Sequence, residues 1–415
     1  MIRSAPRESP RVSWLYFLLC ALAIFLTVPF ARGVRLFVTE QWGRVTFAYL
    51  VAGCVLAGAG WLIGSLRRRG EFRVASVAWI AGVVVVYLAW TAFLAQRLSP
   101  EEAFHFLEYG ALSYLAFRAL SHQVRDPSIY PASVLLCAIV GTLDEFIQWL
   151  TPGRVWALED VGLNVGSAAL MQIVLWKGIR PALISAEPVR ARSWQRVARL
   201  GALSALLLAL SLFNTPPRIA WYAKRVPFLG YLLRHEGVMA EYGHRYSDPE
   251  TGVFFSRFSL GALHRHDAEE GAAAGRILEE YREEKRYAEF LERFSPAVDP
   301  FVHEARVHLF RRDRYRARIA DFPDDLSEQR FHATVAFREN RILEKYFPAT
   351  LAASGQAWPL SERARLEALL DPTMEYVSHV SDQLIVSLTD WQLSGGILLV
   401  AGLLLIVGFR PGRWA

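Results

Sequence analysis

Long apolar stretches with almost no charge recur along the chain and alternate with shorter arginine-rich segments. A helix of roughly 20 mostly apolar residues is long enough to cross a bilayer. The first stretch follows three arginines, as a signal peptide would, but it ends in a poor cleavage site, so we expect a retained helix. Six clear and two weaker stretches predict eight spans: Ser13–Ala31, Thr46–Leu66, Val74–Ala95, Phe104–Leu120, Ile129–Leu150, Leu158–Trp176, Val197–Phe213 and Trp391–Phe409.

The distribution of Lys and Arg predicts how these spans are oriented, because positive residues concentrate in short cytoplasmic loops. With the N-terminus inside, the inner loops of the membrane part hold 17 Lys and Arg residues and the outer loops hold 5. We therefore expect an integral inner (cytoplasmic) membrane protein with both termini in the cytoplasm. Residues 214–389 then lie outside the cytoplasm, although an error of one span would reverse this placement.

The segment between the last two predicted spans has a different composition. It holds 24 Lys and Arg against 27 Asp and Glu, so it offers no basic face for nucleic acid. A turn cluster between aromatic flanks predicts one hairpin within Gly243–Phe258. The other patterns predict helices: an amphipathic one at Asp267–Phe294, with Arg282–Arg286 as its solvated side, and others at Val302–Ile319, Leu326–Tyr346 and Ser361–Leu370.

These patterns together predict an all-α polytopic membrane protein of about eight transmembrane helices, with a mostly helical extracytoplasmic domain inserted before the last helix. The expected organisation has five parts: a two-helix membrane segment (1–73), a second membrane domain (74–176), a basic cytoplasmic loop with the seventh helix (177–213), the extracytoplasmic domain (214–389) and the last helix (390–415).

Polar residues cluster where three predicted spans begin or end at the outer face. On helices, residues three or four apart share a face, and this spacing recurs in each of the three spans. Ionisable groups near hydrocarbon are costly, so such a cluster is a functional-site hypothesis; the alternative is that these residues merely end helices at the water interface. The polar cluster consists of His105, Glu108, Tyr109, Asp144, Glu145, Gln148, Arg154, Asp160 and Asn164.

The order of these residues resembles the VanZ-like family of bacterial membrane proteins. The resemblance covers about residues 74–176 and rests on Asp144-Glu145-x-x-Gln148, Pro152-Gly153-Arg154, Asp160-x-x-x-Asn164 and the His105-x-x-x-Tyr109 helix start. The family usually has an Asp-Lys pair ahead of the histidine, where this chain has Glu101 and Glu102, and Ser167 replaces an expected glycine. The family name implies a link to the cell envelope and to glycopeptide resistance, without defining a reaction.

Two functions follow as hypotheses, and whether the protein is an enzyme stays open. In the first, the cluster binds or transforms a lipid-linked or anionic envelope substrate: Glu145, Asp144 and His105 would carry the catalysis, and the other six residues would bind substrate. In the second, the cluster is a hydrogen-bond network that locks the helices of a scaffold, and the inserted domain recruits a periplasmic or cell-surface protein. Membrane lipids are partners in both hypotheses; a transporter ranks last because no inverted repeat is apparent.

Metal and cofactor signals are weak in this sequence. His264-x-His266 with Asp267 could ligate zinc, but no His-Glu-x-x-His spacing is present, and the other histidines of the insert, among them His235, lie on separate predicted elements. We therefore predict no metal site and leave the cofactor unknown. The segment from Trp221 to Tyr231 carries aromatic and cationic residues that suit either a membrane surface or a packed core.

Overall fold

The computed structural model describes residues 8–96, 100–152, 154–185, 189, 191–234 and 237–410. The chain forms two compact units. The membrane unit comprises the residues up to Leu210 together with those from Gly395 onward, and the insert unit comprises Ser211–Ser394.

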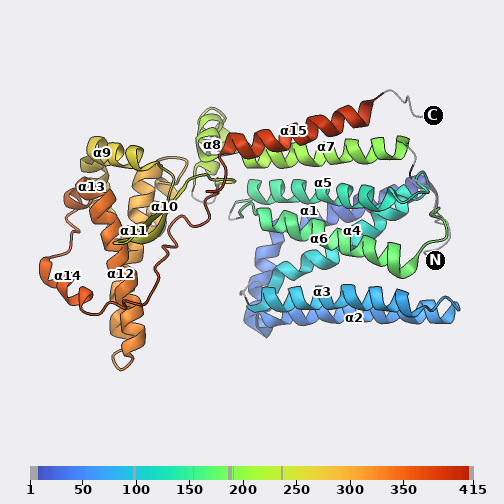
Figure 1. Ribbon diagram of the computed structural model, residues 1–415, viewed down its shortest axis with the longest axis horizontal. Helices are drawn as coiled ribbons and strands as arrows, with labels where there is room; N and C mark the ends of the chain where they lie inside the picture. Colours follow the sequence, from blue (N-terminus) through green and yellow to red (C-terminus); the bar gives the residue numbers. More distant parts are fainter. Residues whose placement is uncertain are drawn as a thin grey trace. The chain divides into compact units, whose positions relative to one another are not determined.

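Each apolar stretch predicted to cross the membrane lies in one continuous helical segment (Figure 1). Within the described residues, seven helices are long and apolar enough to cross a membrane. The eighth, α4, has 17 residues and falls just short, so the count of eight spans stays a prediction. The helices are α1 (Pro10–Trp42), α2 (Val45–Arg68), α3 (Val74–Gln96), α4 (Phe104–Leu120), α5 (Ile129–Leu150), α6 (Leu158–Ile173), α7 (Ala191–Phe213) and α15 (Asp390–Phe409). A short 3₁₀ turn, η1 (Pro100–Ala103), precedes α4, and a π-helical turn, η2 (Val174–Ile179), extends α6.

Helix α1 is much longer than the sequence indicates. It runs for 33 residues with Pro29 inside it, so the predicted end near Ala31 is wrong. Arg32 and Arg35, assigned to an outer loop, lie on the helix. A proline inside a helix removes one backbone donor and disfavours the helix. In a membrane protein, neighbouring groups tolerate that loss.

Hydrogen bonds between side chains and backbone hold α3, α4 and α6 together. The Tyr87 hydroxyl on α3 donates to the Ser167 carbonyl on α6 over 3.0 Å, and the Ser167 hydroxyl donates to the Phe106 carbonyl on α4 over 2.8 Å. Deeper in the unit, Gln172 Nε2 donates to the Ser113 hydroxyl over 2.7 Å. Such bonds matter here because lipid supplies no hydrophobic force between helices. The sequence did not predict that Tyr87, a single tyrosine within an apolar stretch, forms a hydrogen bond between two helices.

The insert unit contains one antiparallel hairpin and a set of helices. Strands β1 (His244–Asp248) and β2 (Gly252–Ser256) pair with His244 opposite Ser256, which confirms the predicted hairpin. The helices are α8 (Pro216–Ala223), α9 (Leu260–Glu280), α10 (Tyr287–Arg293), α11 (Pro300–Arg318), α12 (Leu326–Tyr346), α13 (Pro348–Ala353) and α14 (Leu360–Glu367), with short 3₁₀ turns at Pro227–Leu233, Glu284–Arg286 and Ile319–Asp321. Helix α12 has the predicted bounds, and α11 and α14 lie close to theirs.

One helix predicted in the insert unit is wrong in its bounds. The expected helix at Asp267–Phe294 is two helices, because α9 ends at Glu280 and α10 starts at Tyr287. The charge run Arg282–Arg286 therefore lies in the break between them. Tyr281 is fully buried at this break and packs edge-on against Phe290. The free energy gained by burying this aromatic pair outweighs that of continuing the helix.

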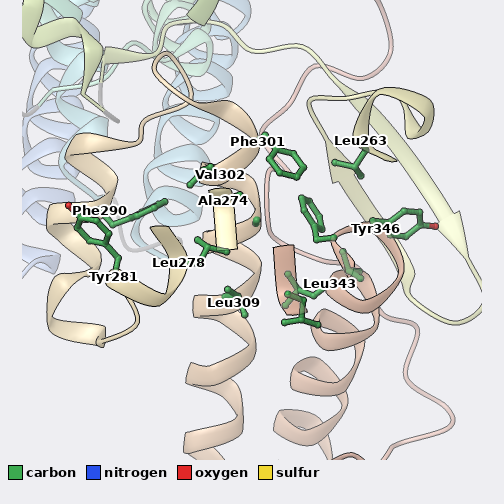
Figure 2. Packing of buried hydrophobic residues seen from close by; sticks show 14 of the residues in the cluster. Leu263, Ala274, Leu278, Tyr281, Phe290, Phe301, Val302, Leu309, Leu343 and Tyr346 are labelled. Atoms are coloured by element: carbon green, nitrogen blue, oxygen red, sulfur yellow. The ribbon is translucent and has the colours of Figure 1, made fainter. Parts of the chain in front are cut away.

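The core of the insert unit lies between α9, α11, α12 and the hairpin (Figure 2). Phe301 and Leu309 of α11 face Leu343 and Tyr346 of α12, and all four side chains are buried. Phe254 of β2 packs on Tyr346 with ring centroids 4.7 Å apart. The unit thus has its own hydrophobic core.

Asp267, considered above as a zinc ligand, instead caps a helix. Its carboxylate accepts from the backbone N–H of Ala349 (2.8 Å) and Thr350 (2.9 Å) and from the Thr350 hydroxyl (2.7 Å). In the described part of the chain, no group of three or more His, Cys, Asp and Glu residues is placed to hold a metal ion. His235 lies outside the described residues.

Replacing Asp267 by Ala is expected to destabilise the insert unit by about 1–3 kcal/mol, because buried donors lose their acceptor. Hydrogen exchange of the α13 amides in the full-length protein measures this loss. Glu270→Ala, one turn later on the exposed side of α9, is the matched control. Equal exchange in the two variants would contradict the capping role.

Candidate functional site

The structure brings the polar cluster together at one end of the membrane unit. The first turns of α4, the last turns of α5 and the first turns of α6 meet there, and these three helices pack against one another. Tyr109, Glu145 and Asn164 have no exposed surface, while Asp144 and Gln148 are 2% and 3% exposed. Ser99 and Gly153, two positions used to predict the helix start and the turn, lie outside the described residues.

Glu145 is the most completely paired acid of the cluster. Its Oε1 accepts from Gln148 Nε2 over 2.7 Å, and its Oε2 accepts from the backbone N–H of Ala157 over 3.2 Å. Gln148 also accepts a hydrogen bond from the Arg154 guanidinium. These contacts connect the end of α5 to the chain that leads into α6, so Glu145 positions the turn between the two helices.

Asp144 and Asn164 are buried but only partly paired. Asp144 Oδ2 accepts from the Tyr109 hydroxyl over 3.3 Å and from Gln148 Nε2 over 3.4 Å, while its Oδ1 has no partner among the described residues. Neither the oxygen nor the nitrogen of the Asn164 amide has a partner there. A buried polar group without a hydrogen bond costs about 1–3 kcal/mol. Three such atoms in one cluster are therefore candidates for contact with a bound molecule.

Gly141 lets α5 approach α6 and α4 closely at this point. A Cβ atom at Gly141 would lie 3.0 Å from Asn164 Cβ, 3.1 Å from Asn164 Nδ2 and 3.3 Å from Tyr109 Cε1. The position one turn before Asp144 therefore has to be a glycine for Asn164 to sit where it does. The sequence did not predict this close packing.

The rim of the cluster is more open. His105 Nδ1 lies 3.5 Å from Glu108 Oε2, and their side chains are 16% and 31% exposed. His105 lies within electrostatic range of Asp160 and Glu145 as well, and Asp160 within range of Arg154. All nine predicted residues are thus in one assembly. Trp156, which prediction missed, is also buried there with its indole N–H unpaired among the described residues.

Negative groups outnumber positive ones at this end of the unit. The cluster holds Glu108, Asp144, Glu145 and Asp160, whereas its described cationic groups are Arg154, which bonds to Gln148, and His105. Carboxylates accept hydrogen bonds and attract cations. The arrangement suits a molecule that donates hydrogen bonds from hydroxyl or amino groups.

Comparison with known proteins gives one match. Residues 13–180 match the model of the VanZ/LLP1 family. The matched residues include the whole polar cluster, and they extend beyond both ends of the segment, residues 74–176, in which the sequence resembles this family. No curated protein and no solved structure matches the chain. The matched segment of this membrane protein is thus VanZ-like, and the insert unit lies outside it.

Proposed function

We propose that the VanZ/LLP1-like segment binds the polar headgroup of a lipid-linked cell-envelope molecule in its polar cluster. The observation that carries this proposal is the set of unpaired buried atoms: Asp144 Oδ1 and both amide atoms of Asn164. Ligand hydroxyl groups there would donate to the two oxygens and accept from the Asn164 amide nitrogen, whereas an amine would donate to the oxygens alone; the stability lost by burying these atoms unpaired would return as binding energy.

The chemistry of the cluster narrows the class of headgroup. Excess carboxylate repels a phosphate that comes close, because the four acidic residues of the cluster outnumber its described cationic groups, Arg154 and His105. A headgroup rich in hydroxyl or amino donors, as in a glycan or an amine-bearing lipid, fits better than a bare anion. If the bound molecule is also transformed, His105 beside Glu108 is placed to carry a proton at the open rim.

The direction of the helices supports placing the cluster and the insert on one side of the membrane. Near the start of α7, the Ser193 hydroxyl donates to Asp126 Oδ2, just before α5, over 2.6 Å. A Cβ at Gly201, further along α7, would lie 3.8 Å from Leu135 of α5. The two helices therefore run the same way, and α7 leaves the membrane unit at the end where α5 carries the cluster. With the arginine bias, both face outward from the cytoplasm, consistent with an envelope role linked to glycopeptide resistance.

The second candidate is a non-enzymatic scaffold that recruits an envelope protein through the insert unit. The complete pairing of Glu145 favours it, because a catalytic base would keep an oxygen available. Under this reading Glu145→Gln has a mild effect and removal of the insert unit a severe one.

Asn164→Leu separates the two readings. Leucine has the same branched heavy-atom skeleton as asparagine and no polar atoms, so the protein should stay folded with equal or higher thermal stability. We expect the wild type, purified in mild detergent, to retain an envelope lipid that is enriched over the bulk membrane, and the variant to lose it. Mass spectrometry of lipids extracted from the purified full-length protein measures both.

Gln172→Leu on the same helix is the matched control. Gln172 donates to Ser113, so its loss should lower stability while leaving lipid retention per folded molecule unchanged. If the wild type and Asn164→Leu retain the same lipids in the same ratio, the cluster is not a headgroup site and the scaffold reading holds.

A further inference from the structure

Beside the polar cluster, the membrane unit has an apolar groove between α3 and α6 with a volume of about 800 Å³. Pockets for small ligands commonly measure about 300–1,000 Å³. One wall of the groove is formed by Val86, Trp90 and Phe93 of α3. The other wall is formed by α6, where Leu170 lies at the end farthest from the polar cluster. The α3 side chains are exposed, and in a spanning helix an exposed apolar side chain faces lipid. The groove is therefore open to the hydrocarbon of the membrane.

Two glycines make the α6 side of the groove. Gly162 and Gly166 both line it, and a Cβ added at either position would meet no atom within 4 Å. This Gly-x-x-x-Gly spacing often lets two membrane helices pack closely. Here α3 does not close onto it. The glycines instead leave an unfilled hollow whose walls are already held in place by the bond from Tyr87 to Ser167.

The groove covers the depth of about one leaflet. From Gly162 to Leu170, eight residues of helix rise about 12 Å, and half of the hydrocarbon core measures about 15 Å. A partner helix that crosses the membrane would need a contact surface along the whole bilayer. A hollow limited to one leaflet, and beginning at the level of the polar cluster, has the dimensions of a lipid chain.

The end of the groove nearest the polar cluster is acidic. Glu102 and Glu159 line it, and Glu159 directly precedes Asp160 of the cluster. The groove thus passes from apolar walls to two carboxylates that lie beside the polar cluster, while the nine residues of the cluster do not themselves line it. An occupant complementary to both parts has a hydrocarbon chain and a headgroup with amino or hydroxyl donors.

We propose that this groove binds one hydrocarbon chain of a lipid whose amine-bearing headgroup lies against the acidic end and the polar cluster. The proposal rests on the headgroup site proposed above and adds the class of molecule that the site takes: a membrane lipid entering sideways from the outer leaflet. Trp90 and Phe93 contact the chain, and the two glycines make room for it.

The test uses the full-length protein in lipid nanodiscs with a photoreactive probe. The probe is a phospholipid with an ethanolamine headgroup and a diazirine in one acyl chain; a second probe has the same chain on a glycerol headgroup. After irradiation, mass spectrometry locates labelled peptides. We expect labelling at Val86–Leu94 and Gly162–Leu170, stronger for the ethanolamine probe, with that preference lost in the Glu102→Gln, Glu159→Gln double variant.

Gly166→Leu fills the groove and is expected to lower labelling about tenfold, the loss that displacing about two chain methylenes would cause. Gly58→Leu is the matched control, since Gly58 on α2 also has open space around it and does not line the groove. Equal labelling of wild type and Gly166→Leu would overturn the proposal. The proposal would also be overturned if Gly166→Leu abolished self-association of the protein and left labelling intact, because the groove would then bind a helix of a second copy.

Failure here can be told apart from failure of the headgroup site. If Asn164→Leu abolishes lipid retention while Gly166→Leu leaves labelling unchanged, the headgroup site stands and the groove proposal is wrong. If Gly166→Leu removes labelling while Asn164→Leu changes nothing, the groove holds a lipid chain that has no relation to the cluster, and the joint assignment of chain and headgroup is wrong.

Discussion

Replacing Glu339 by Leu is expected to destabilise the insert unit by about 3–5 kcal/mol, the cost of breaking a buried ion pair by removing one partner. Glu339 has no exposed surface. It accepts from His308 Nδ1 and the Tyr376 hydroxyl, both over 2.5 Å, and from the Ser378 hydroxyl over 2.7 Å. The Arg311 guanidinium lies 3.1 Å from it. Leucine would leave all these donors buried without their acceptor.

The same residue predicts how stability depends on pH. Burial by itself raises the pKa of Glu339, but the charge of His308 and the hydrogen bonds from His308, Tyr376 and Ser378 outweigh burial and hold that pKa below its usual value. A carboxyl with a lowered pKa in the folded state contributes stability above its unfolded pKa of about 4.3 and loses it as the pH falls through the folded value. Wild type should therefore lose stability in acid, and Glu339→Leu should lack this component.

Hydrogen exchange of the α11 and α12 amides in the full-length protein, measured between neutral pH and pH 3, reports both effects. Glu328→Leu on the same helix is the control, because its side chain is 47% exposed. Glu339→Gln, which keeps the size and removes the charge, isolates the electrostatic part. Wild-type protection in Glu339→Leu would show that the buried network does not hold α11 to α12.

Gly141→Val is expected to have the largest effect on the membrane unit. Valine would place atoms within about 3 Å of Asn164 and close to the Tyr109 ring, where the packing has no room. Overpacking of this kind costs about 1–3 kcal/mol. Because the displaced residue is Asn164, lipid retention should also fall, which thermal unfolding and lipid mass spectrometry of the purified full-length protein would show together.

Gly82→Val on α3 is the control for this substitution. A Cβ at Gly82 meets no atom within 4 Å, so the same change in helix propensity occurs without a collision. If both variants behave like wild type, α5 can move away from α6 without loss, and the close approach at Gly141 has no bearing on the site.

The assembly of the cluster was predictable because helix periodicity and membrane topology are both local properties. Residues three or four apart on a helix share a face, and successive spans alternate in direction. His105, Asp144 and Asp160, each near the end of a span on the same side, therefore had to lie at a similar depth. The spacing of residues does not predict which of the facing polar atoms form hydrogen bonds with one another.

The sequence by itself determined the membrane character, the helical class, the hairpin and most residues of the cluster, because apolar length and periodicity act over a few turns. The tertiary structure decided that Glu145 is fully paired while Asn164 is not. It also decided that α1 continues past Pro29 and that α3 and α6 leave a groove between them. The helix expected at Asp267–Phe294 is divided in two at the buried Tyr281. Each depends on contacts between residues far apart in the chain, where the pairing of buried polar atoms and the volume of side chains outweigh local preference.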